Sequence, residues 1–130
     1  MITTEFTRTD SLLRLAMRAD AVLTGLAGLA VLPIAGWVAE ISGTTTAIEY
    51  SLAAFFIGYG VVVFGLAALP SVRRAGLAVI AANLLYSLAA VAVVVSDVWT
   101  MTVTGVVITL ATGVYTAGFA ALQYRGVRRI

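Results

Sequence analysis

The 130-residue sequence contains no cysteine, no histidine and no lysine. Without cysteine there are no disulfides, no thiolate metal sites and no cysteine nucleophile. Without histidine the chain lacks the commonest metal ligand, the usual haem axial ligand and the commonest general base. No other residues pair a nucleophile with a base, so we expect a protein that is not an enzyme and uses no cofactor.

Charge is scarce as well. Only 11% of the residues are charged, 62% are hydrophobic, and the mean hydropathy is +1.07. Soluble domains are about 45–50% apolar and about 25% charged. A soluble core of this size cannot bury so many apolar residues, so lipid must be the solvent for most of the surface. The length of the chain predicts a single domain. The net charge of +2 and the placement of the arginines argue against a nucleic-acid partner.

Four apolar runs dominate the chain, at 21–39, 51–69, 75–95 and 101–122. Nineteen residues in a helix span about 28 Å, close to the hydrocarbon thickness of a bilayer. The runs therefore predict an all-α fold, an integral membrane four-helix bundle. Pro33 is expected to kink the first helix. A signal peptide is excluded because the first run is too long and Trp37 blocks the cleavage motif.

A short charged segment, 10–19, precedes the first run. Asp10 is a good N-cap, Asp10 and Arg14 have the spacing of a weak i,i+4 ion pair, and Arg14 and Arg18 have that of a like-charge pair. This pattern predicts a short N-terminal interfacial helix that lies among lipid head groups. The alternative is a solvated helical extension of the first membrane helix.

The charges are sorted between the two ends of the expected helices. If the N-terminus is cytoplasmic, every arginine is cytoplasmic, and the acids Glu40, Glu49 and Asp97 are outside. This satisfies the positive-inside rule. We therefore predict a multi-pass protein of the bacterial plasma membrane with both termini in the cytoplasm (N-in/C-in).

Small residues recur at helical spacing in each run. Such ridges allow membrane helices to approach closely, since lipid does not drive them together by hydrophobicity. We expect helix packing at Gly25, Gly28, Gly58, Gly65, Gly105, Gly113 and Ala117. The same ridges could instead form a groove or a second interface for a partner.

A polar layer is predicted inside the bundle. Counted from the cytoplasmic helix ends, Asn83 and Tyr115 lie about 12 Å deep, Tyr59 about 15 Å and Tyr86 about 16 Å. Two interpretations stay open, interhelical hydrogen bonds that fix packing or a pocket for the head group of a small lipid or quinone. Asp20 is placed at the inner membrane boundary, as an interfacial ion pair with Arg18 or Arg74. Its alternative is a proton-titrating site, although a coupling carboxylate is expected nearer the midplane.

Four segments carry a resemblance: RLAMRADAVLTGLAGLA at 14–30, Gly58-Tyr59-Gly60, Asn83-Leu84-Leu85-Tyr86, and AGFAALQYR at 117–125. Together they resemble an uncharacterised family of small actinobacterial four-transmembrane-helix proteins. The third helix departs from that pattern, because its aromatic residue is Tyr86 rather than a tryptophan. The resemblance implies the fold and the membrane location, and no activity.

Two functions fit these features. The first is a small accessory or assembly subunit, or a homo-oligomer, that acts through helix–helix contacts with itself or another membrane protein. The alternative is a carrier or binding protein for a small lipophilic molecule, a lipid or a quinone, held in the bundle core. Apart from such a partner, membrane lipid is the only expected contact.

Overall fold

The computed structural model describes residues 2–130, and the side chains from residue 9 onward. All its regular elements are helices: α1 (Ile2–Val31), the 3₁₀ helix η1 (Leu32–Ile34), α2 (Ala35–Ser42), α3 (Thr46–Leu66), α4 (Arg73–Ser96) and α5 (Val103–Arg128). Four segments are long and apolar enough to cross a membrane: Thr9–Ser42, Thr46–Leu66, Arg73–Ser96 and Val103–Arg128. The prediction of an all-helical chain with four such segments is confirmed.

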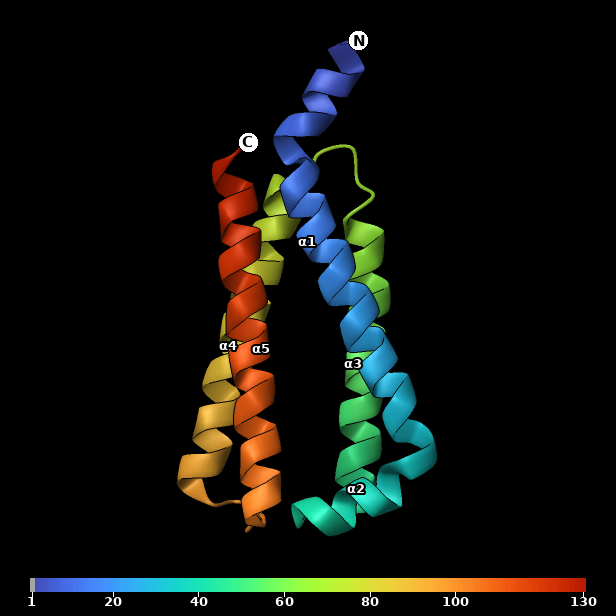
Figure 1. The fold of residues 1–130 in the computed structure, drawn as a ribbon, viewed down its shortest axis with the longest axis vertical. Coiled ribbons are helices and arrows are strands. Elements are labelled where there is room, and N and C mark those ends of the chain that lie inside the picture. Colours follow the sequence, from blue (N-terminus) through green and yellow to red (C-terminus); the bar gives the residue numbers. More distant parts are fainter. Residues whose placement is uncertain (1) are drawn as a thin grey trace.

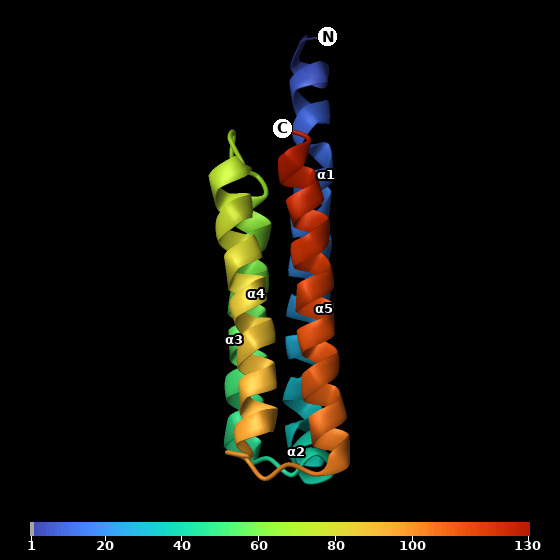
Figure 2. The ribbon, with the colours of Figure 1, turned by 90° about the vertical axis from the view of Figure 1, so that its left-hand side faces the viewer.

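The long helices form two pairs. α1 packs along α3, and α4 packs along α5 (Figure 1). The pairs are joined mainly by α1 and α5, while α3 and α4 scarcely touch although they are consecutive in the chain. Figure 1 shows the pairs converging near the two termini and spreading apart at the other end, and Figure 2 shows the same helices from the side. The separation between the two pairs therefore increases away from the termini (Figure 1).

The first predicted span is not one straight helix. α1 ends at Val31, η1 contains Pro33, and α2 then runs beneath α3 towards the start of α5 (Figure 1). The predicted kink is confirmed, but a single helix over 21–39 is wrong. Proline interrupts it because the ring cannot donate a backbone hydrogen bond and clashes with the preceding turn.

The far end of α2 is fastened to α5. The Thr102 backbone N–H donates to the carbonyl oxygen of Ser42 at 3.1 Å, and its hydroxyl donates to that of Ile41 at 2.6 Å. Gly43 follows α2 with φ of +74°, a conformation that glycine adopts without strain. α2 therefore bridges the two pairs at their spread end.

The separate interfacial helix expected at 10–19 is not present. These residues continue without a break into the rest of α1, and Leu13 and Met17 are fully buried in the hydrophobic core. A methyl group added at Gly126 would lie 2.6 Å from the Cα of Leu13. The segment thus packs tightly inside the molecule, and the helical-extension alternative describes it better, although its inner face is buried rather than solvated.

The residues expected at helix contacts divide into two groups. A Cβ added at Gly28 would lie 2.6 Å from the Ala53 carbonyl oxygen, and one at Gly105 would clash with the carbonyl oxygen of Ser42. Gly113 lies near Ala90, and Gly25 near Gly60. The expectation is wrong for Gly58, Gly65 and Ala117, which are exposed, and the two glycines have no neighbour within 4 Å.

Candidate functional site

A carboxylate lies at the centre of the molecule. Asp20 of α1 is fully buried, and its Oδ2 atom accepts three hydrogen bonds. The hydroxyl of Tyr59 donates at 2.7 Å, and the side-chain amides of Asn83 and Gln123 donate at 3.0 Å each. One residue from each of α1, α3, α4 and α5 therefore meets at this oxygen.

The other carboxylate oxygen completes the arrangement. The Thr24 hydroxyl donates to Asp20 Oδ1 at 3.0 Å, and the Tyr115 hydroxyl lies 3.0 Å from Thr24 Oγ1 and 3.5 Å from Asp20 Oδ1. The Asn83 amide also donates to Gln123 Oε1 at 3.0 Å. We call these six residues, listed here, the Asp20 cluster: Asp20, Thr24, Tyr59, Asn83, Tyr115 and Gln123.

No cation pairs with Asp20. Among the side chains that the structure describes, the one ion pair joins Asp10 and Arg14 at 2.8 Å, which confirms that predicted contact. Arg18 and Arg74 are exposed, so the expected ion pair with Asp20 is wrong. The helical repeat explains this: Asp20 follows buried Leu13 and Met17 on the inner face of α1, and Arg18 does not share that face. Neutral donors surround a carboxylate that burial would otherwise destabilise.

The depth expected for Asp20 is corrected too. Asp20 is bonded to Asn83, which lies ten residues after Arg73 and hence about 15 Å along α4. Asp20 was expected at the boundary because the first span was counted from residue 21. The helical segment that is long and apolar enough to cross a membrane instead runs from Thr9 to Ser42, so Asp20 lies within it rather than at its end.

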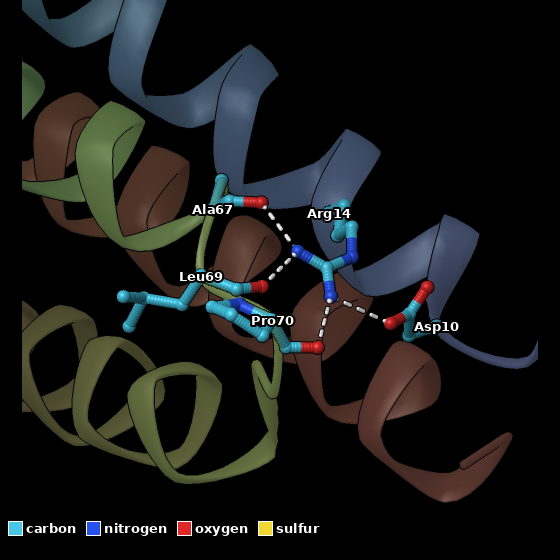
Figure 3. Close-up of polar contacts among 5 residues, drawn as sticks. All are labelled: Asp10, Arg14, Ala67, Leu69 and Pro70. Atoms are coloured by element: carbon cyan, nitrogen blue, oxygen red, sulfur yellow. Dashed lines mark hydrogen bonds and ion pairs between the residues drawn. The ribbon is translucent and has the colours of Figure 1, made fainter. Parts of the chain in front are cut away.

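Arg14 is placed one and a half turns before Asp20, at the end of the molecule that holds the termini. Its guanidinium donates to the carbonyl oxygens of Ala67 at 2.8 Å, Leu69 at 2.6 Å and Pro70 at 3.1 Å (Figure 3). These are carbonyls at and just beyond the end of α3, which a helix leaves without partners. The sequence offered no signal for this contact beyond the Asp10 pairing.

The predicted polar layer is partly assembled. Tyr59, Asn83 and Tyr115 belong to the Asp20 cluster, but Tyr86 does not: its hydroxyl donates to Thr112 at 3.1 Å and its ring packs against Phe56. Sequence reasoning missed Gln123, which lies one residue beyond the fourth apolar run at 101–122. A signal existed, since Gln123 lies ten residues after Gly113 and three after Ala120, on one face of α5.

A cavity of about 340 Å³ adjoins the cluster. Small-molecule pockets occupy about 300–1,000 Å³ and are mostly apolar with a few polar groups. All four long helices line the cavity, chiefly with apolar and aromatic side chains such as Leu23, Phe55, Phe56, Tyr86 and Ile108. Its polar lining includes four members of the Asp20 cluster, namely Thr24, Tyr59, Asn83 and Tyr115.

Among the described side chains, no group of three or more aspartate or glutamate residues is placed to hold a metal ion. The cluster offers hydroxyl and amide groups around one carboxylate, next to an apolar space. Comparison with protein-family models, curated proteins and solved structures finds no match to this chain.

Proposed function

We propose that this chain is an integral membrane protein that binds a small lipophilic molecule between its two helix pairs. The observation that carries the proposal is the cavity of about 340 Å³, apolar along its walls and bordered by the Asp20 cluster. A molecule with an apolar body and one polar head group matches this lining. The proposal favours the carrier or binding interpretation of the sequence over the accessory-subunit one.

The proposed setting is the plasma membrane of a bacterium, with the four long helices as a bundle across it and both termini in the cytoplasm. Two features support this. Large apolar side chains such as Leu29, Val62, Leu88 and Val107 are more than half exposed on the outside of the four helices. The arginines lie in α1, at the start of α4 and at or just after the end of α5, at the end of the molecule that holds the termini (Figure 1).

The test fills the cavity without touching the Asp20 cluster. Ala111 lines the cavity from α5, so Ala111→Phe is expected to occupy part of it. Ala121→Phe is the matched control, because Ala121 is exposed on the same helix and does not line the cavity. The measurement is native mass spectrometry of protein purified in mild detergent from native membranes.

We expect the wild-type protein and Ala121→Phe to retain a lipophilic molecule of defined mass, and Ala111→Phe to lose it. Retention of the same molecule by all three proteins would place it outside the cavity and contradict the proposal. Helical content measured by circular dichroism shows whether each variant is folded, and Asn83→Leu, which removes a polar group at the cavity, should also lose the molecule.

A second function, the accessory or assembly subunit or homo-oligomer, is favoured by one observation. Gly58 and Gly65 lie seven residues apart on α3, exposed and without a neighbour within 4 Å. Small residues on an exposed membrane-helix face allow another helix to approach closely. A protein that stays monomeric in mild detergent, and captures nothing after cross-linking in native membranes, would contradict this function.

A further inference from the structure

We propose that the molecule in the cavity carries an organic ammonium head group, and that Asp20 is the residue that selects it. This inference rests on the proposed function and specifies the chemical class of the ligand. It is argued from the direction of the hydrogen bonds in the Asp20 cluster, from the charge of Asp20 and from the aromatic walls of the cavity.

The first argument is a count of donor hydrogens. Four residues of the cluster line the cavity, and together they own five polar hydrogens: one each on Thr24, Tyr59 and Tyr115 and two on the Asn83 amide. Tyr59, Thr24 and Asn83 each donate to Asp20, and Asn83 also donates to Gln123. The Tyr115 hydrogen goes to Thr24 or to Asp20.

Every one of these hydrogens is therefore turned away from the cavity, towards the carboxylate or its neighbours. These four residues can therefore offer a ligand only oxygen atoms, which accept hydrogen bonds. A head group that only accepts, such as a carboxylate or an ester, would find no donor among them. A head group that donates would be matched.

The second argument is charge. Asp20 has no cationic partner among the described side chains, and it is fully buried, so its interaction with another charge is screened little by solvent. Because Asp20 is itself fully buried, it acts on the cavity through the hydroxyl and amide groups it orients, as a positioning residue. An ammonium ion beside those groups would supply the missing positive charge and donate hydrogen bonds at the same time.

The third argument is the cavity wall. The rings of Phe55, Phe56 and Tyr86 line it, and the Phe56 and Tyr86 rings pack with centroids 5.9 Å apart. Aromatic faces attract ammonium ions through their quadrupoles, more strongly where water is excluded. A lipophilic amine therefore matches all three features: the accepting oxygen atoms at the Asp20 cluster, the carboxylate of Asp20 without a cationic partner, and the aromatic walls of the cavity.

The test uses three probes with one apolar body, a phenyl ring on four methylene groups: 4-phenylbutylammonium, 4-phenylbutan-1-ol and 5-phenylpentanoate. Binding to the full chain is measured by isothermal titration calorimetry in an uncharged maltoside detergent at neutral pH, where the primary amine is protonated. We expect the ammonium probe to bind at least about tenfold more tightly than the alcohol, which corresponds to one charge-assisted hydrogen bond, and the carboxylate to bind most weakly. In Asp20→Asn the preference for the ammonium probe over the alcohol should fall to the roughly threefold that a single aromatic contact accounts for.

The outcomes separate this inference from the proposed function. If the alcohol binds to the wild-type protein as tightly as the ammonium probe, or if Asp20→Asn keeps the full wild-type preference for ammonium, the ammonium inference is overturned and the binding function stands. If none of the three probes binds, the inference fails, and the ligand retention described above decides the binding function by itself.

A second variant keeps the inference testable if Asp20→Asn does not fold. Phe56→Leu removes an aromatic face from the cavity wall and leaves the Asp20 cluster intact. We expect the ammonium probe to lose about threefold more affinity than the alcohol, as a single cation–π contact predicts. An equal loss for both probes would overturn the inference.

Discussion

Tyr59 and Tyr86 lie at similar depth but make different hydrogen bonds. Their hydroxyl groups should therefore contribute differently to the stability of the protein. The Tyr59 hydroxyl donates to the buried carboxylate of Asp20, whereas the Tyr86 hydroxyl donates to the neutral hydroxyl of Thr112. Hydrogen bonds to charged groups contribute about 1.5–3 kcal/mol, and neutral ones about 0.5–1.5 kcal/mol. We expect Tyr59→Phe to lower the free energy of unfolding by more than Tyr86→Phe.

The measurement is reversible unfolding of both variants in the same mixed micelles, followed by circular dichroism. Each substitution removes one oxygen from a partly buried tyrosine, so the pair controls for the change in apolar surface. A Tyr86→Phe loss equal to or larger than the Tyr59→Phe loss would mean that Asp20 is not the charged centre of the cluster.

Arg14 fastens α1 to the end of α3. Its Nη1 atom donates hydrogen bonds to the carbonyl oxygens of Ala67 and Leu69. Its Nη2 atom donates to the carbonyl oxygen of Pro70 and to the carboxylate of Asp10. A lysine has a single nitrogen and cannot reproduce this fork. We expect Arg14→Lys to lower the free energy of unfolding by about 1–2 kcal/mol.

Hydrogen–deuterium exchange localises the effect. Amides of the α3–α4 turn, residues 67–72, should exchange faster in Arg14→Lys. Arg18→Lys is the control, since Arg18 is exposed one turn further along α1. If Arg18→Lys speeds exchange in this turn as much as Arg14→Lys does, the loss of the forked hydrogen bonds of the Arg14 guanidinium is not the cause of the faster exchange.

Helices were the part of the fold that the sequence predicted well, because long apolar runs and their arginine and acid borders depend only on local composition. Which residues face inwards was predicted less well. The apolar runs were bounded by their first and last uninterrupted apolar residues. This leaves Arg14 and Asp20 before the first run and Gln123 after the fourth. In the structure, buried Leu13 and Val127 extend the packed region beyond those ends.

The helix contacts show why a small-residue pattern alone was insufficient. Almost every helix in this chain has small residues on more than one face, so the pattern does not say which face meets a neighbour. Gly58 and Gly60 lie two residues apart on α3 and therefore point in different directions. The packed residue is Gly60, and the sequence pattern had favoured Gly58.

These two glycines provide a prediction about the α1–α3 contact. A methyl group at Gly60 would lie 2.6 Å from the Ala21 carbonyl oxygen, so Gly60→Ala must push the two helices apart. Overpacking of this kind costs about 1–3 kcal/mol. A methyl group at Gly58 meets nothing within 4 Å, so Gly58→Ala should leave stability unchanged or raise it through helix propensity.

Unfolding of the two variants in the same micelles checks this prediction. The contact between α1 and α3 also holds Asp20 next to Tyr59, so Gly60→Ala should weaken binding of a cavity ligand as well. If Gly60→Ala is as stable as Gly58→Ala, the distance between α1 and α3 at Gly60 must be larger than in this structure.

Taken as a whole molecule, the chain is two helix pairs held together at one end by α1 and α5 and bridged at the other by α2. Between the pairs α3 and α4 scarcely touch, and the cavity lies in this loosely packed region. In the proposed membrane setting, no hydrophobic driving force pulls helices together, so an apolar space between them is not closed by collapse as it would be in water. The architecture and the cavity therefore have one physical origin.

The proposed orientation in the membrane can be tested by labelling introduced cysteines, and the composition of the chain makes this test simple. Because the chain has no cysteine, one introduced cysteine is the only thiol. Ser71 and Ser96 are both exposed and lie at opposite ends of α4, so the same Ser→Cys change samples the two ends. In bacterial spheroplasts, a membrane-impermeant maleimide should label Ser96→Cys directly and Ser71→Cys only after permeabilisation, because Arg73 and Arg74 hold their end in the cytoplasm. The opposite pattern would invert the orientation, and equal labelling of both before permeabilisation would contradict a single orientation across the membrane.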